Sequence, residues 1–148
     1  MVKGSHRNFE NFLFVSAEND AINGCKAGGM GDVIRDVPRQ IAAKGDLVHV
    51  VTPSYSRLHL SQTFITTLHF NYRGVEYHAE LFEVAPKKAF PGIFHYVIHH
   101  SEIKSGDIAH IYFDDPEQPF FQDACMFSLF SVAVAQAIKD DVFGKIPI

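Results

Sequence analysis

Cysteine is scarce in this sequence, since Cys25 and Cys125 are the only two among 148 residues. So small a number excludes a disulfide-stapled secreted domain and is typical of the reducing cytoplasm, which is the localisation we expect. Cys25 precedes Lys26, and a neighbouring positive charge lowers the pKa of a thiol. A catalytic cysteine also needs a histidine partner, which the sequence does not place, so a redox or nucleophilic role is not favoured.

Positive charge and long apolar runs are scarce as well. Thirteen Lys and Arg stand against 17 Asp and Glu, a formal net charge of −4. This balance gives no electrostatic case for nucleic acid or for an anionic membrane. No apolar run approaches the roughly 20 residues that span a bilayer, and the N-terminus lacks the pattern of a signal peptide. We therefore expect no nucleic acid and no membrane among the partners.

The length and composition fit one globular domain. Hydrophobic residues make up 47% of the chain and charged residues 20%, which is ordinary for a soluble protein. We expect a single domain over residues 1–148, with residues 1–8 disordered or vector-derived.

Apolar runs and a helical pattern alternate in the first third of the chain. Residues 12–15 and 47–52 are short continuous apolar runs, typical of parallel strands covered on both faces. A helix is predicted between them, over residues 30–44. Strand, helix and strand at this spacing form a βαβ unit with a right-handed crossover. The first strand is followed by a loop rich in turn-forming residues, the usual place of ligands in such sheets.

The predicted helix has an apolar stripe and one proline. Val33, Val37 and Ile41 recur four residues apart with Ile34 beside them, and this spacing predicts the buried face. Pro38 lies inside the helix, where it removes a backbone hydrogen bond. We expect a kink there, or a first turn distorted around a ligand.

The middle of the chain changes to β-branched and aromatic residues in rough alternation, which predicts strands. Arg73-Gly74 is a predicted tight turn, so the region reads as a β-hairpin insertion that extends the sheet. The fold class expected is α/β, with a mostly parallel sheet. The further predicted elements are strands over 63–72, 75–84, 93–99 and 109–113, and a helix over 123–138.

Several side chains could suggest a metal site. No H-x-x-x-H or C-x-x-C spacing accompanies the histidines, so we predict no metal and no cofactor. Asp114 and Asp115 could serve as a general acid and base, but a Pro-flanked surface turn is favoured. The histidines considered are His69, His78, His95, His99, His100 and His110.

The most informative stretch is residues 25–33, where a strand-to-helix turn carries Gly28, Gly29 and Gly31. Glycines let a ligand approach the backbone closely, and a helix N-terminus presents free N–H groups and a positive dipole end. Lys26 adds a positive charge. The pattern is compatible with a phosphate or diphosphate site and equally with a turn that only lets strand and helix pack closely. It matches neither the P-loop nor the dinucleotide fingerprint.

These residues also resemble a known family. Residues 26–33 resemble the K-T-G-G-L-[GA]-D-V signature of bacterial glycogen synthases and plant starch synthases, glycosyltransferase family five. Residues 12–18 resemble the family's first strand ending in Ser-Glu, and 48–55 its V-x-V-V-x-P-x-Y strand. Residues 127–131 resemble the R-F-A-L-F-S opening of a long helix. The likeness is strong over 12–55. Further matches to the family's first helix are Pro38, Ala42, Ala43 and Gly45.

The resemblance implies the Rossmann-like N-terminal half of a GT-B glycosyltransferase. It implies transfer of glucose from ADP-glucose or UDP-glucose to an α-1,4-glucan with retention, as in glycogen biosynthesis. The partners implied are therefore a nucleotide sugar and a glucan acceptor. The family's signature lysine contacts the donor phosphates, and this role carries over to Lys26, with Gly28 and Gly29 letting backbone amides approach. The resemblance implies no catalytic residue within these 148 residues.

Departures from the family pattern lie in three places. Met126 stands where the family has arginine, Gln122-Asp123 where it has Asp-Asn, and the loop over 18–26 is two residues longer and lacks a proline. The H-D-W-H and T-V-H-N segments of the reaction centre, and the C-terminal GT-B domain, are missing from the 148 residues. The chain alone is therefore expected to be inactive.

Two other functions stay open at this point. One alternative is a stand-alone, non-catalytic module that binds glucan or a nucleotide sugar. A second is another phosphate-handling α/β protein, which the absence of a Walker lysine pattern disfavours. The sequence does not distinguish ADP from UDP in the donor.

Overall fold

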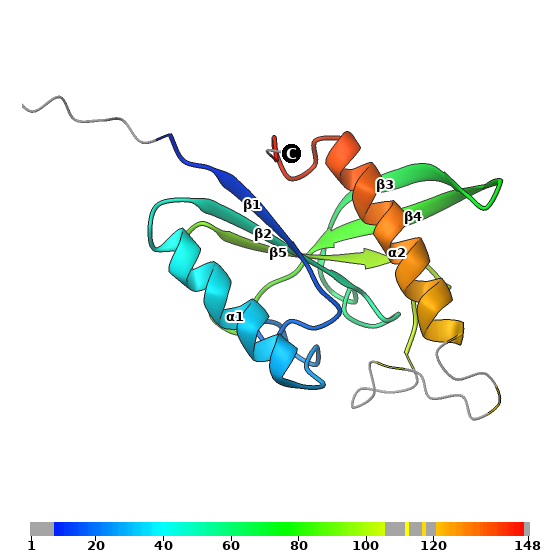
Figure 1. The fold of residues 1–148 in the computed structure, drawn as a ribbon, viewed down its shortest axis with the longest axis horizontal. Helices are drawn as coiled ribbons and strands as arrows, with labels where there is room; N and C mark the ends of the chain where they lie inside the picture. Colours follow the sequence, from blue (N-terminus) through cyan, green and yellow to red (C-terminus); the bar gives the residue numbers. More distant parts are fainter. Residues whose placement is uncertain (1–7, 106–111, 113–116, 118–120, 147–148) are drawn as a thin grey trace, which may run out of the picture.

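The computed structural model describes residues 8–105, 112, 117 and 121–146. Within these residues, five strands form one sheet, and two helices pack on it (Figure 1). The expected strand over 109–113, His110, Asp114 and Asp115 lie largely or wholly outside the described residues, as do residues 1–7.

The sheet has the strand order β1-β2-β5-β4-β3. β1, β2 and β5 run parallel to one another, whereas β4 is antiparallel to both β5 and β3. This order places β1 at one edge and β3 at the other. The α/β class is confirmed. The strands are β1 (Asn11–Val15), β2 (Leu47–Pro53), β3 (Thr63–Tyr72), β4 (Val75–Glu83) and β5 (Ile93–His99).

The predicted hairpin is confirmed. Tyr72 pairs with Val75 across a two-residue turn, and both turn residues, Arg73 and Gly74, have positive φ (53° and 76°). Turns of this kind match the right-handed twist of the flanking strands. β3 and β4 therefore extend the parallel part of the sheet as an antiparallel ribbon.

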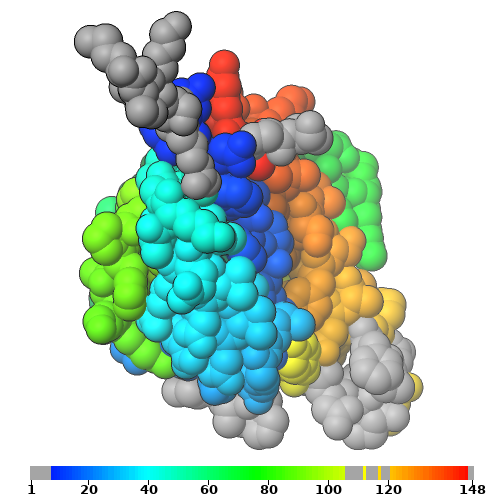
Figure 2. All heavy atoms as spheres, turned by 60° about the vertical axis from the view of Figure 1, so that its left-hand side comes forward, coloured from blue at the N-terminus to red at the C-terminus, as the bar shows by residue number. Residues whose placement is uncertain are grey.

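The two helices cover opposite faces of the sheet. The helices are α1 (Gly29–Ala42) and α2 (Phe121–Lys139). Successive residues of β2 point to opposite faces of the sheet. Val50 packs in the hydrophobic cluster that contains Ile34 of α1, whereas Val51 packs in the larger cluster that contains Leu129 of α2. Figure 2 shows β1, in blue, at the surface between α1, in cyan, and α2, in orange.

The predicted buried stripe of α1 is wrong for two of its members. Val33 is 54% exposed and Val37 is also exposed, whereas the helix buries Ile34 and Pro38. The helix carries two apolar stripes, and the described strands cover only the one that Ile34 and Pro38 share. α1 continues through Pro38 as one helix.

α2 is long and apolar enough, by length and composition, to span a membrane, which the sequence reading did not anticipate. In this structure, however, it packs on the sheet as a core helix does, and its exposed side includes Ser131 and Lys139. Its buried residues are Met126, Leu129, Phe130, Ala133, Val134 and Ala137.

Candidate functional site

The loops after β1 and β2 meet at the carboxyl ends of the parallel strands, where open α/β sheets bind ligands. The Tyr55 hydroxyl donates a hydrogen bond to the carbonyl oxygen of Ala17 (2.6 Å). The Arg57 guanidinium donates to the carbonyl oxygen of Gly24 (2.8 Å). These bonds hold the loop before the glycine-rich turn against the loop that follows β2.

A buried histidine supports the same loop from β5. The side-chain amide nitrogen of Asn19 (Nδ2) lies 2.9 Å from Nδ1 of His95. Burial lowers the pKa of His95 to about 4, so the ring is neutral at pH 7 and its Nδ1 accepts this bond. The expectation of a histidine whose ring is hydrogen-bonded within the protein is confirmed at this position.

Glu18 is the central contact of the turn. Its side chain is only 3% exposed, and Oε2 accepts hydrogen bonds from the backbone amides of Gly28 (2.7 Å) and Ala27 (3.1 Å). Oε1 accepts a third from the hydroxyl of Tyr112 (3.0 Å). Burial alone would raise the pKa of the Glu18 carboxyl, but the bonds from Gly28, Ala27 and Tyr112 outweigh it and the pKa is lowered. The charged carboxylate therefore holds the turn.

The three glycines of the turn differ in what surrounds them. A Cβ on Gly31 would lie 3.2 Å from Cγ of Lys26 and 3.4 Å from the backbone nitrogen of Asp20, so Gly31 packs closely and a larger residue would push the Lys26 side chain aside. A Cβ on Gly29 would meet no atom within 4 Å among the described residues, and none of the three has a positive φ. The packing explanation accounts for Gly31 but not for Gly29, whose open side leaves the backbone accessible.

Gly28 is the N-cap of α1, and the helix starts at Gly29. The first amides of a helix have no partner within the helix. Gly28 donates its amide to Glu18, whereas the amides of Gly29 and Met30 have no hydrogen-bond partner among the described residues. Any anion at this helix start would therefore meet Gly29 and Met30 first.

Lys26 lies beside this helix start, and its side chain is exposed. Its Nζ donates to Oδ1 of Asp32 (2.7 Å), and this bond raises the pKa of the ammonium group. An ammonium group has three donors, so two remain after the bond to Asp32. The assignment of Lys26, Gly28 and Gly29 to substrate binding stays a prediction.

Asp20 ties the loop to its surroundings. Its carboxylate pairs with Lys87 (2.8 Å) and with Arg35 of α1, and these hydrogen bonds lower the pKa of Asp20. The backbone amide of Asp20 also donates to the carbonyl oxygen of Gly31 (3.1 Å). The loop is therefore formed in advance, before any ligand binds.

Cys25 lies under the turn and is fully buried. Burial raises the pKa of its thiol to about 12. The idea that Lys26 would lower this pKa is wrong, because removal from water disfavours the thiolate more than the nearby charge favours it. Cys25 is a packing residue.

This burial predicts the thiol chemistry of the folded chain. We expect a chromogenic disulfide reagent to modify Cys125 alone at neutral pH, and Cys25 only after unfolding, because the thiolate is the reactive form. Counting modified thiols before and after adding denaturant checks this. Rapid modification of Cys25 in a folded Cys125→Ser variant would contradict it.

Two of the three departures from the family pattern, at Gln122-Asp123 and at Met126, lie together at the start of α2. Gln122, Asp123 and Met126 line one hollow of about 280 Å³, together with Glu102 and Lys104 from the loop after β5. Met126 is itself buried.

The model of the starch synthase catalytic domain family matches residues 11–147. The chain belongs to this family. Among solved structures, this starch synthase family chain is similar to the catalytic domain of Starch Synthase IV from Arabidopsis thaliana bound to ADP and acarbose, with a TM-score of 0.56 and 18% identity. The match covers 84% of this chain and 26% of that one, so the chain spans about a quarter of its length. No curated protein matches.

At this identity the structural likeness concerns the fold, and it shows that the family domain described here has the architecture of a GT-B glycosyltransferase domain. Sequence reasoning placed Lys26 and the glycines at the helix start but missed Glu18 as the group that holds the turn. The Ser-Glu ending of the first strand was the available signal. Tyr112, the second contact of Glu18, carries no local signal, because it lies 94 residues away.

Proposed function

We propose that this chain supplies the donor-phosphate side of a glucosyltransferase site. The reaction proposed is transfer of glucose from ADP-glucose or UDP-glucose to the 4-OH of an α-1,4-glucan, with retention. Membership of the starch synthase family supports it, and the similar solved domain is one that binds ADP and acarbose. The observation that carries the proposal is that the exposed Lys26 ammonium binds Asp32 in the first turn of α1, the helix whose start leaves the amide of Gly29 uncrowded and without a partner among the described residues.

The proposed chemistry concerns the leaving group. When the bond between the glucose C1 and the diphosphate oxygen breaks, negative charge develops on the nucleoside diphosphate. Lys26 and the amides of Gly29 and Met30 would stabilise that charge, as preorganised donors do in other transferases. Glu18 already takes the amides of Gly28 and Ala27, so Gly28 would serve by its small size rather than by its N–H group.

We further propose that the reaction needs the remainder of the GT-B fold, including its C-terminal domain. β1 lies at the sheet edge, and its residues Phe12 and Phe14 are only partly buried, although its apolar run is typical of an interior strand. On α1 the stripe of Met30, Val33 and Val37 is exposed. Further strands of the complete fold would cover both the open edge of β1 and the exposed apolar stripe of α1. Two free cysteines support a cytoplasmic location.

The 148-residue chain alone is therefore expected to transfer no glucose. The measurement is incorporation of labelled glucose from ADP-glucose and UDP-glucose into glycogen, by this chain and by the longest natural reading frame that contains it. The longer protein should be active and the short one should remain at the background of a no-enzyme control. Turnover by the short chain would contradict the proposal that the rest of the fold is needed.

A non-catalytic binding module is the second candidate. The observation that favours it is the buried Met126 in place of the family's arginine, beside the hollow at the start of α2. Titrating the chain with maltoheptaose and with ADP-glucose tests this function. Saturable binding, together with no transfer by the longer reading frame, would replace the enzyme proposal.

A further inference from the structure

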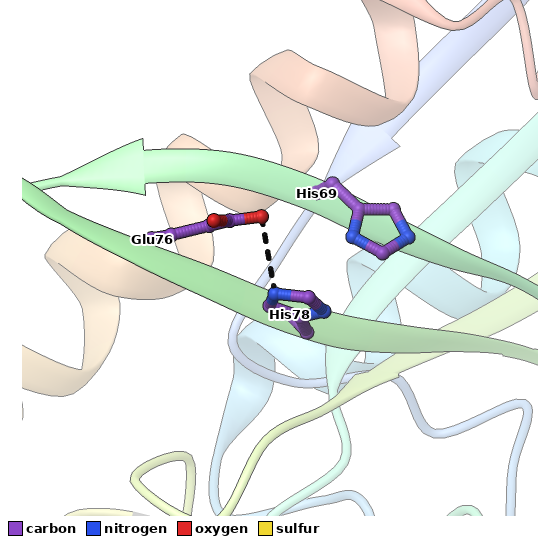
Figure 3. A group of neighbouring side chains, drawn as sticks. All are labelled: His69, Glu76 and His78. Carbon is purple, nitrogen blue, oxygen red and sulfur yellow. Dashed lines mark ion pairs between the residues drawn. The ribbon is translucent and has the colours of Figure 1, made fainter.

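The exposed face of the β3–β4 hairpin brings two histidines and a glutamate together. His69 pairs directly with His78 across the strands, and Glu76 lies two residues before His78 on the same face. Figure 3 shows the three side chains close together on the two strands, with a dashed line marking the ion pair between Glu76 and His78. This grouping depends on strand register and has no counterpart in the H-x-x-x-H or C-x-x-C spacings of helices and loops.

The distances suit a metal ion. One donor atom from each of His69, Glu76 and His78 lies within 4.8 Å of the others. Nε2 of His78 is 3.3 Å from Oε1 of Glu76. Ligands bound to tetrahedral Zn²⁺ at about 2.0–2.1 Å are about 3.4 Å apart, so this pair is already spaced correctly. The donor atom of His69 lies within 4.8 Å of the other two, so it has to move by at most about 1.4 Å to reach this spacing.

The chemistry of the donors is also suitable. Imidazole nitrogens and a carboxylate oxygen are common zinc ligands, and three protein ligands leave the fourth tetrahedral position for water. The side chains of Glu76 and His78 are 73% and 54% exposed, so water reaches this position and the side chains are free to adjust. The antiparallel strands below them fix the spacing of their Cβ atoms.

We propose that His69, Glu76 and His78 form a zinc-binding site on the β3–β4 hairpin, which replaces the sequence-based expectation of no metal. The ion would link β3 to β4 beside the turn and hold their register. The site lies on strands at the sheet edge opposite β1, away from the glycine-rich turn. The zinc-site proposal is therefore independent of the proposed glucosyl transfer, and either can be wrong without the other.

A neighbouring hollow of about 330 Å³ offers a rival set of ligands. It is lined by His78 together with Glu80, His99 and His100. Because His78 belongs to both groups, a test has to separate them. His69→Gln and Glu76→Gln remove ligands of the proposed site alone, and His100→Gln is the matched control for the hollow. All three positions are at or near the surface, so the variants are expected to fold.

The test is calorimetric titration of the 148-residue chain with Zn²⁺ at about pH 7.5, where an ordinary imidazole is neutral. We expect one saturable site, weakened about tenfold or more in His69→Gln, Glu76→Gln and His78→Gln and unchanged in His100→Gln. At ten times the dissociation constant, Zn²⁺ should raise Tm by about 4 °C in the wild type.

Three results would overturn the proposal. The first is the absence of saturable binding, and the second is equal weakening by every histidine substitution, which indicates diffuse binding. The third is a loss in His78→Gln and His100→Gln but not in His69→Gln, which would place the ion in the hollow. Circular dichroism of each variant, recorded without metal, confirms that the comparison is made between folded chains.

Discussion

Replacing Lys26 by alanine in the longest natural reading frame that contains this chain is expected to lower kcat about 100-fold or more. Lys26 has two ammonium donors left after its bond to Asp32 in the first turn of α1, the helix that starts at Gly29. Without it, the charge that develops on the departing diphosphate would meet only the helix amides. Initial rates at saturating donor and glycogen measure the effect.

Lys44→Ala is the matched control for this experiment. Lys44 lies just beyond the opposite end of α1 and is also exposed, so its removal should leave kcat unchanged. The role given to Lys26 would be wrong if kcat of the Lys26→Ala protein stayed within about threefold of wild type. A rise in KM for the donor at unchanged kcat would restrict Lys26 to binding of the donor before reaction.

Glu18→Ala is expected to destabilise the 148-residue chain by about 3 kcal/mol. The substitution leaves the amides of Gly28 and Ala27 and the hydroxyl of Tyr112 without their acceptor, and Glu18 is almost fully buried. Hydrogen bonds to an ionised acceptor are about twice as strong as neutral ones. Urea unfolding followed by circular dichroism gives the free energy of unfolding.

Two further variants test the reason for this loss. Glu18→Gln keeps the shape and an acceptor oxygen but removes the charge, so about 1 kcal/mol should be lost. Glu76→Ala removes an exposed glutamate and should change stability by less than about 0.5 kcal/mol. If Glu18→Ala proves as mild as Glu76→Ala, the carboxylate does not hold the turn.

The charge of Glu18 also sets a pH dependence. Because the pKa of Glu18 is lower in the folded chain, its contribution to stability is complete above the ordinary glutamate pKa and is lost as pH falls through the folded value. The stability difference between wild type and Glu18→Gln should therefore shrink below about pH 4.5.

The strands could be predicted from the sequence because apolar and polar residues alternate with a period of two, and because glycine or proline marks where a strand ends. Arg73-Gly74 fixed the hairpin, and the predicted bounds of β3 and β5 match the structure. The buried face of α1 was not readable in the same way. Val33 and Ile34 are both apolar, and only the extent of the described sheet decides which of them is covered.

The site was predictable only where its residues adjoin in the chain. Lys26 and the glycines form a local motif, whereas the contact between Glu18 and Tyr112 spans 94 residues. The direction of the pKa shift of Cys25 was predicted wrongly, because the sequence shows the adjacent positive charge but not the burial that outweighs it. His69 and His78 come together through strand register, so spacing rules for helices and loops overlooked them.

The most direct measurement of the central claim is a crystal structure of the longest natural reading frame with its nucleoside diphosphate product, ADP or UDP. We expect Nζ of Lys26 and the amides of Gly29 and Met30 to lie about 3 Å from phosphate oxygens, with Glu18 still bound to Gly28. A bound diphosphate held elsewhere, with Lys26 paired only to Asp32, would contradict the account.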